Sequence, residues 1–226
     1  LDSLGNEQTK NTLIKHGAKE PFFGVRVGDL KTIVKKVKKN HELSLALFST
    51  GNTDAMYLAG LIADEKKMTP DILNEWAHKA YWYMLAEYTV PWIAADAGYG
   101  WEMGIKWIES DIEQVAACGW ASLSNAILVT NNDQLSINEI DELIIRVENN
   151  IHDAQNRVRY AMNAFIIAAG SSSPDLAAKA KDVGAKIGKV EVDMGGTACK
   201  VPEITTYISK IEQRGAIGKK KKVARC

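Results

Sequence analysis

Apolar side chains recur along this chain with the spacing of amphipathic helices. Leu30, Ile33, Val34 and Val37 follow an i, i+3, i+4, i+7 pattern, and residues 137–147 repeat it over polar partners. Such a period gathers the apolar residues on one face of a helix. Strand-like alternation is nearly absent, so the sequence predicts an all-α protein.

Polar capping residues mark where these helices should begin. Thr53 opens one apolar stretch, and Thr69, Ser136 and Ser173 precede three others, two of them before a proline suited to a first helical turn. Glycines mark where helices should end: Gly51, Gly98, Gly170 and Gly188. Together these signals predict about a dozen helices, over residues 6–17, 28–39, 42–50, 53–65, 70–81, 84–97, 101–109, 112–130, 137–149, 154–170, 174–188 and 204–213.

The predicted helices pair in chain order, and the pairs start roughly every thirty to forty residues, close to the period of HEAT-like helical hairpins. We therefore expect a right-handed α-α superhelix, a HEAT-like or ARM-type solenoid of about six hairpins. Residues 1–215 would form this single domain, and residues 216–226 a basic C-terminal tail. An irregular all-α globule is the alternative. A solenoid would present one concave wall of inner helices to an elongated ligand.

Composition narrows the class of protein. The chain has 226 residues, of which 46% are hydrophobic, which is enough to bury a substantial core. No apolar run approaches the roughly 18 residues of a membrane span, and the first residues do not resemble a signal peptide, so we expect the cytoplasm. Three distant cysteines without a C-x-x-C pair and four histidines without metal spacing predict no disulfide framework, metal or cofactor.

The formal net charge is zero, but the charges are segregated. Residues 1–40 hold nine Lys or Arg against four Asp or Glu, whereas residues 41–115 hold four against twelve. Basic ends of this kind suit phosphate groups. The alternative for the tail is a solvated or disordered end. The candidate phosphate contacts are Arg26, Lys31, Lys35, Lys219, Lys220, Lys221, Lys222 and Arg225.

All six tryptophans lie between residues 76 and 120, with four tyrosines among them. Aromatic residues this dense form either a thick core or a stacking surface. Trp82 and Tyr83 are adjacent and cannot both point inward from one helix, and Glu87 would lie near the helical face of Tyr83. The segment predicts a carboxylate beside an exposed aromatic ring, or alternatively a core tryptophan and a solvated glutamate.

Familiar catalytic motifs are missing: the sequence has no G-x-S-x-G, H-E-x-x-H or phosphate-loop pattern. Residues 193–200, with two glycines beside Cys199 and Lys200, could form a functional loop. We favour a turn that packs the last helix, because paired glycines most often occur where the backbone adopts a conformation that other residues disfavour.

Several stretches resemble the DNA alkylation repair proteins of the AlkD-like type, which are HEAT-repeat proteins. They are FFGVRVGDL at 22–30, NTDAMYLAGLIAD at 52–64 and WIESDIEQVAACGW at 107–120. The C-terminal KIGKVEVDMGGTACKVP and IGKKKKVARC look like a distinct subgroup. The resemblance implies DNA glycosylases of base excision repair, which remove N3- or N7-alkylated purines from duplex DNA held in the concave groove without a cofactor.

In such glycosylases the alkylated base is already a good leaving group, so a carboxylate mainly stabilises an oxocarbenium-like sugar and positions water. Matching Tyr81 and Trp82 to the family's tryptophan pair puts Ala86 at the catalytic aspartate, with Glu87 one position later. Ala117 falls at the DNA-contacting arginine, and Ala164 or Phe165 at the second groove tryptophan. The resemblance thus implies a relocated acid at Glu87 or a DNA binder that excises no base, and we slightly favour the second.

We therefore expect a DNA-binding HEAT-like protein whose partner is alkylated or damaged duplex DNA. Glu87 is the candidate catalytic residue, and the candidate groove residues are Trp82, Tyr83, Trp92, Arg157 and Arg159. The alternative is a non-enzymatic scaffold that binds a protein partner, which zero net charge favours. Basic residues that converge on the concave wall would favour DNA.

Overall fold

The computed structural model describes residues 1–225, and these residues form helices and no strands. The predicted all-α class is confirmed. Twelve α-helices are α1 (Glu7–Lys15), α2 (Val27–Val37), α3 (His41–Ser49), α4 (Thr53–Ile62), α5 (Pro70–Lys79), α6 (Val90–Asp96), α7 (Gly100–Trp107), α8 (Glu113–Val129), α9 (Ile137–Asn150), α10 (Asn156–Gly170), α11 (Pro174–Ile187) and α12 (Ile204–Gln213). A π-helical turn, Leu85–Thr89, precedes α6 directly.

The side chains at the helix starts act as expected with one exception. Thr69, Ser136 and Ser173 each accept a hydrogen bond from the backbone N–H three residues on, as N-caps do. For α4, however, the cap is Asn52, which accepts from the Ala55 N–H at 3.1 Å. Thr53 is instead the first helical residue of α4.

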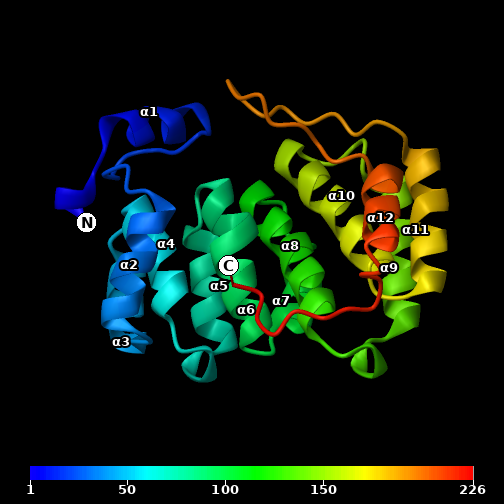
Figure 1. Ribbon diagram of the computed structural model, residues 1–226, viewed down its shortest axis with the longest axis horizontal. Coiled ribbons are helices and arrows are strands. Elements are labelled where there is room, and N and C mark those ends of the chain that lie inside the picture. The colour runs from blue at the N-terminus through cyan, green and yellow to red at the C-terminus, as the bar shows by residue number, and fades with distance from the viewer. Residues whose placement is uncertain (226) are drawn as a thin grey trace.

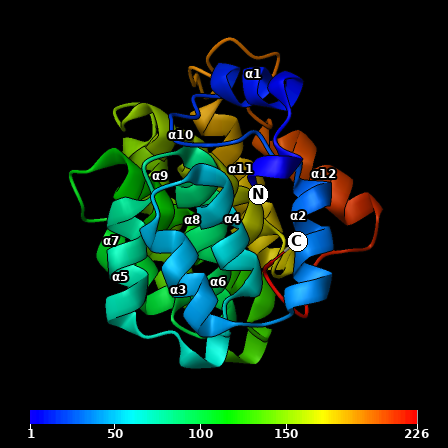
Figure 2. The ribbon, with the colours of Figure 1, turned by 90° about the vertical axis from the view of Figure 1, so that its left-hand side faces the viewer.

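The helices stack in layers (Figure 1). In Figure 2, α3, α5, α7 and α9 form one side of the molecule and α2 and α12 the opposite side, with α4, α6 and α8 between them. The inner helix α8 packs against both α6 and α10, and α3, α7 and α11 pack against α4, α8 and α10, respectively. This arrangement is that of stacked helical hairpins with an inner and an outer layer.

The first helix departs from the predicted pairing. Residues 6–17 and 28–39 were expected to form a hairpin, but α1 lies crosswise above α2 and α4 (Figure 1), and α2 packs on α4 instead. The connection between α1 and α2 is drawn into the fold by Asp54, whose carboxylate accepts hydrogen bonds from three consecutive N–H groups, those of Phe23, Gly24 and Val25. This connection leaves α1 free to cover the end of the stack.

The tryptophans belong mainly to the core. Trp76, Trp82, Trp92, Trp107 and Trp120 are all buried. Trp76 stacks on Phe48 with ring centroids 3.9 Å apart and planes 3° from parallel. Of the two interpretations of the aromatic segment, the structure supports the core.

Residues 216–225, here called the C-terminal strap, run back from α12 across the C-terminal ends of the inner helices (Figure 1). Lys220 Nζ and the Lys221 N–H donate to the last carbonyls of α8 at 2.7 and 2.8 Å. Arg225 is bound by Glu65 at 2.6 Å and Asp96 at 2.9 Å. Helix C-termini carry partial negative charge, so they are suited to hold a basic segment.

Among residues 1–225 no helix is both long and apolar enough to cross a membrane.

Candidate nucleic-acid interface

Glu87 and Arg157 form a buried ion pair at the middle of the inner layer. Arg157 Nε and Nη2 each donate to one carboxylate oxygen of Glu87 at 2.6 Å. The side chains are 4% exposed for Glu87 and 16% for Arg157. This bidentate geometry uses both oxygens of the carboxylate.

The π-helical turn explains why Glu87 points inward. Pro91 lies four residues after Glu87 and has no N–H to give to the Glu87 carbonyl, and its ring crowds that carbonyl. The chain responds with a wider turn, in which the Val90 N–H reaches back five residues to the Leu85 carbonyl. Such π turns insert one residue into a helix and often accompany functional sites. The turn therefore changes the helical register at Glu87.

Two tyrosines enclose the cation of the pair. The guanidinium carbon of Arg157 lies 4.6 Å from the ring centroids of both Tyr83 and Tyr160. Cation–π contacts of this kind are stronger when the cation is desolvated. Arg157 is held by its charge partner and by both rings, so it is fixed in one orientation.

The pKa directions follow from this environment. Burial raises the pKa of the Glu87 carboxyl above its ordinary value, while the hydrogen bonds and charge of Arg157 act to lower it. Burial acts to lower the pKa of Arg157, but the hydrogen bonds and charge of Glu87, together with the charge interactions of Tyr160 and Tyr83, raise it. Arg157 thus stays a cation and serves as the counter-ion of Glu87.

A cavity of about 360 Å³ opens beside this pair, between the end of α1, the π turn and the start of α8. The Trp82 Nε1–H donates to the His16 carbonyl at 2.8 Å, and the Tyr83 hydroxyl is 3.1 Å from His16 Nδ1. Met194 closes another side, with its sulfur 3.6 Å from Arg157 Nη1. The cavity is therefore bounded by aromatic rings and by one buried ion pair.

The positions that the resemblance singled out meet at this cavity. Ala86 and Ala117, which stand where an aspartate and an arginine were expected, both line it together with Glu87 and Arg157. The cavity thus has a carboxylate and a guanidinium, but Glu87 and Arg157 supply them in place of Ala86 and Ala117. Ala164 lines the next cavity along the inner layer, whereas Phe165 is fully buried.

The predicted groove residues occupy different surroundings. Trp82 and Trp92 are 5% and 8% exposed and present little of their rings to a ligand, because each is packed in the core. Tyr83 is half-buried under Arg157. Arg159 faces a separate cavity beside α11 and does not meet Arg157. Glu87 is neither solvated nor beside an open aromatic ring, because Arg157 lies between it and solvent.

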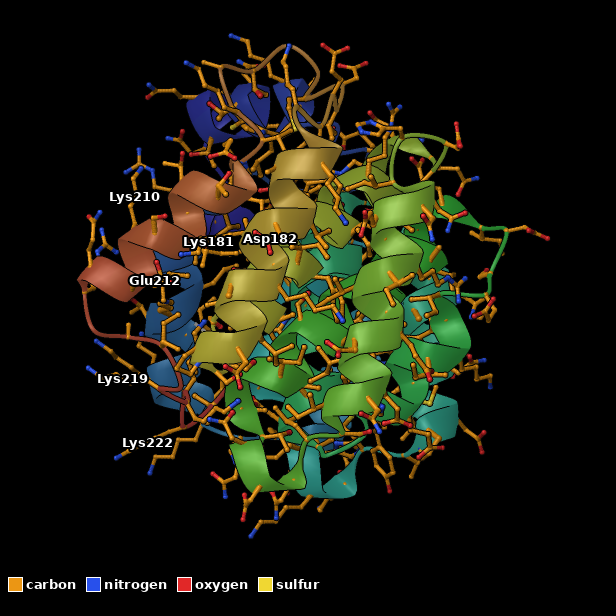
Figure 3. The ribbon with its side chains drawn as sticks, turned by 90° about the vertical axis from the view of Figure 1, so that its right-hand side faces the viewer. Lys181, Asp182, Lys210, Glu212, Lys219 and Lys222 are labelled. Atoms are coloured by element: carbon orange, nitrogen blue, oxygen red, sulfur yellow. The ribbon has the colours of Figure 1, made fainter. Side chains whose placement is uncertain are left out.

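The predicted phosphate contacts divide into two groups. Exposed ones are Arg26, Lys31, Lys35, Lys219, Lys221 and Lys222. Lys220 and Arg225 are instead committed to the strap's own contacts within the described residues. Figure 3 shows Lys210, Lys219 and Lys222 directed away from the molecule on the side of α12. Figure 2 shows α2 on that same side, so α2 and the strap flank one face.

The loop at residues 193–200 contacts α1 and α10. Gly195 approaches the end of α1, where an added Cβ would lie 3.1 Å from the Lys15 carbonyl. Asn156 on α10 holds the loop through two hydrogen bonds to the backbone of Asp193, at 2.7 and 2.9 Å. The loop thus lines the cavity beside the ion pair.

Sequence reasoning missed His16, Tyr160 and Met194. Tyr160 had one available signal, since it lies three residues after Arg157 and so on the same helical face. His16 offered no signal, whereas Met194 belongs to residues 193–200, which the sequence singled out as a possible functional loop without linking them to the pair. Within residues 1–225 no cluster of His, Cys, Asp or Glu is arranged to hold a metal ion.

The chain is similar to several known proteins. The model of a family described as DNA alkylation repair enzyme matches residues 1–184. The chain belongs to that family. Uncharacterized proteins of Listeria monocytogenes and Listeria innocua are 34% and 33% identical to this family member over 220 residues, covering 95% of each chain.

One solved structure is also similar to this DNA alkylation repair family member, with a TM-score of 0.90 and 35% identity over 100% of this chain and 96% of the other. It represents a new family of proteins related to the HEAT-like repeat DNA glycosylases with affinity for branched DNA structures. The HEAT-like architecture predicted from the sequence is therefore confirmed. The family match ends within α11, so α12 and the strap lie beyond it.

Proposed function

We propose that this protein binds duplex DNA, with a preference for branched over linear duplexes, and that it does so without excising bases. The observation that carries the binding proposal is the position of α2 and the strap, whose exposed cations flank one face of the stack. Phosphate contacts supply most of the affinity of such a surface. The preference for branches rests on the relative with affinity for branched DNA structures.

Four acids of the acidic middle of the sequence, which argued against DNA, are engaged inside the fold. Arg157 pairs with Glu87, and Arg225 pairs with both Glu65 and Asp96. Asp54 is satisfied by three backbone N–H groups. Buried and paired acids present little negative potential to an approaching phosphate. This pairing favours DNA over the protein-scaffold alternative.

The enclosure of Glu87 supports binding without excision. A catalytic carboxylate has to reach the sugar or a water molecule, and its hydrogen-bonding capacity has to be free for them. Both Glu87 oxygens are bound by Arg157, and the side chain is 4% exposed. Ala86, where the family's aspartate was expected, carries no carboxylate. We therefore expect no release of 7-methylguanine from methylated duplex DNA.

Salt-dependent binding tests the proposed face. Linear duplexes and three-way and four-way junctions would be titrated across a range of salt concentrations with the wild type and with Lys31→Glu/Lys35→Glu. Each lost phosphate contact should reduce the slope of log K against log salt by about 1. The matched control is Lys106→Glu on the outer helix α7, which should leave the slope unchanged. Equal slopes in all three proteins would refute this binding face.

Base release is measured separately on methylated duplex DNA. The proposal expects none from the wild type. Release that disappears in Glu87→Gln would instead identify a glycosylase with a relocated acid. If neither linear nor branched DNA binds, a protein partner becomes the leading hypothesis.

A further inference from the structure

A second, larger cavity shares Asp193 and Met194 with the cavity beside the Glu87–Arg157 pair and extends between α10, the end of α11 and residues 188–203. Its volume is about 950 Å³, within the range of small-molecule sites. Asn156, Arg159 and Asn163 project into it from one face of α10. Asn163 Nδ2 donates to the Pro202 carbonyl at 2.9 Å, and Asn156 holds Asp193. The loop is therefore fixed to α10 at both Asp193 and Pro202, and the cavity is formed in advance of any ligand.

Arg159 is the unexplained group in this cavity. Its Nε atom is buried and has no hydrogen-bond acceptor among residues 1–225, and no carboxylate of the described chain forms an ion pair with it. A buried donor without an acceptor destabilises the fold, and more so when the group is charged. An acceptor supplied by a ligand would remove this destabilisation.

The acids around the cavity are already engaged. Glu191 pairs with Lys189 at 2.8 Å, and Glu203 caps α12 by accepting from the N–H groups of its first turn. Asp193 accepts from the Gly195 N–H at 2.8 Å. Lys200, which also lines the cavity, forms no ion pair within the described residues. Arg159 and Lys200 thus form no ion pair within the described residues, and Glu191, whose pKa is lowered by Lys189 and also by the charge of Arg159, pairs with Lys189 instead.

The rest of the lining is mainly apolar and includes Val190, Val192, Val201 and Met194. A ligand that fits has an anionic group for the two cations and an organic body for the apolar wall. A phosphate monoester carries close to two negative charges at pH 7, whereas a carboxylate carries one. A guanidinium also matches two oxygens of a phosphate in a bidentate contact.

We propose that this cavity binds a phosphate monoester, with the phosphate on Arg159 and Lys200 and the organic part against the valines. Two sources share this chemistry: a free mononucleotide and the 5′-phosphorylated end of a DNA strand. Neither requires the face flanked by α2 and the strap.

Isothermal titration of the full chain with adenosine monophosphate and with phenyl phosphate tests the proposal. Both should bind saturably to the wild type. Arg159→Gln should weaken them at least about tenfold, the loss expected when a charged hydrogen bond is removed. Lys200→Gln, an exposed change that does not threaten folding, should weaken them severalfold. Arg214→Gln, at an exposed arginine after α12, is the matched control and should bind as the wild type does.

Several results would overturn the proposal. They are no binding at millimolar ligand, unchanged binding in both Arg159→Gln and Lys200→Gln, or benzoate binding as tightly as phenyl phosphate. Competition then separates the sources: a 5′-phosphorylated oligonucleotide that displaces adenosine monophosphate, while its 5′-hydroxyl counterpart does not, identifies a strand end. Failure of both oligonucleotides identifies a free mononucleotide. Lys31→Glu/Lys35→Glu should bind adenosine monophosphate normally, so this result is independent of the DNA-binding face.

Discussion

Replacing Arg157 with methionine would leave the Glu87 carboxylate buried without its counter-ion. Glu87 would then remain inside only by taking up a proton. The cost is set by the distance between the solution pH and its ordinary pKa of 4.5. At pH 7 this distance sets an upper limit of about 3 kcal/mol on the loss of unfolding free energy, and at pH 5.5 of about 1 kcal/mol, because burial already raises the pKa of Glu87 in the wild type.

The sign of the pH dependence follows from the same reasoning. In Arg157→Met the folded-state pKa of Glu87 lies above its unfolded value, because burial is no longer opposed by a cation. The variant is therefore most stable below about pH 4.5, and its deficit relative to the wild type grows as the pH rises toward 7. Loss of the cation–π contacts with Tyr83 and Tyr160 adds a further loss of unfolding free energy that does not depend on pH.

Urea unfolding at pH 5.5 and 7.0, followed by tryptophan fluorescence, measures both parts. The double variant Glu87→Gln/Arg157→Met removes both charges and should recover most of the pH-dependent loss. Lys106→Met, on the exposed side of α7, is the control for losing a cation. A deficit below about 1 kcal/mol at both pH values would show that Glu87 reaches water, which would refute a sealed pair.

Two further results are expected. Gly60→Ala should lower the unfolding free energy by about 1–3 kcal/mol, because the new Cβ would lie 2.4 Å from a side-chain carbon of the π turn; its control, Gly28→Ala, meets nothing within 4 Å and should be neutral or stabilising in the same urea titration. Burial acts to raise the pKa of Glu65, but hydrogen bonds from Lys39, its own backbone and Arg225 lower it to about 2. The stability from Glu65 is thus complete above about pH 4.5 and lost as the pH falls toward 2. Over this range the unfolding free energy of Arg225→Met should depend less on pH than that of the wild type. An identical pH dependence in the two proteins would contradict the role given to Glu65.

Local chemistry explains why so much of the helical framework could be predicted. Thr69, Ser136 and Ser173 cap helices through contacts three residues away, so the necessary information is contiguous in the sequence. The error at Thr53 has the same origin, since Asn52 is an equally good cap one position earlier.

The candidate site could be predicted only in part, because its decisive contacts are distant in sequence. Glu87 and Arg157 are 70 residues apart, and no periodic pattern reports their pairing. The sequence predicted one helix over 84–97, through Pro91, whereas the π turn that precedes this proline packs against α4 and α8, which are distant in sequence. The basic tail had two interpretations of comparable weight, and the ion pairs of Arg225 with Glu65 and Asp96 show that Arg225 belongs to the fold.

The strap also changes how the molecule should unfold. In a stack of hairpins each unit contacts its neighbours, so stability is distributed nearly one-dimensionally and the ends can fray independently. Arg225 joins Glu65 and Asp96, residues that precede it by 160 and 129 positions. Opening the α12 end therefore removes contacts from the first half of the stack. We expect the two halves to unfold in one cooperative transition, with native-state hydrogen exchange in α4 and α6 responding to events at the opposite end of the sequence.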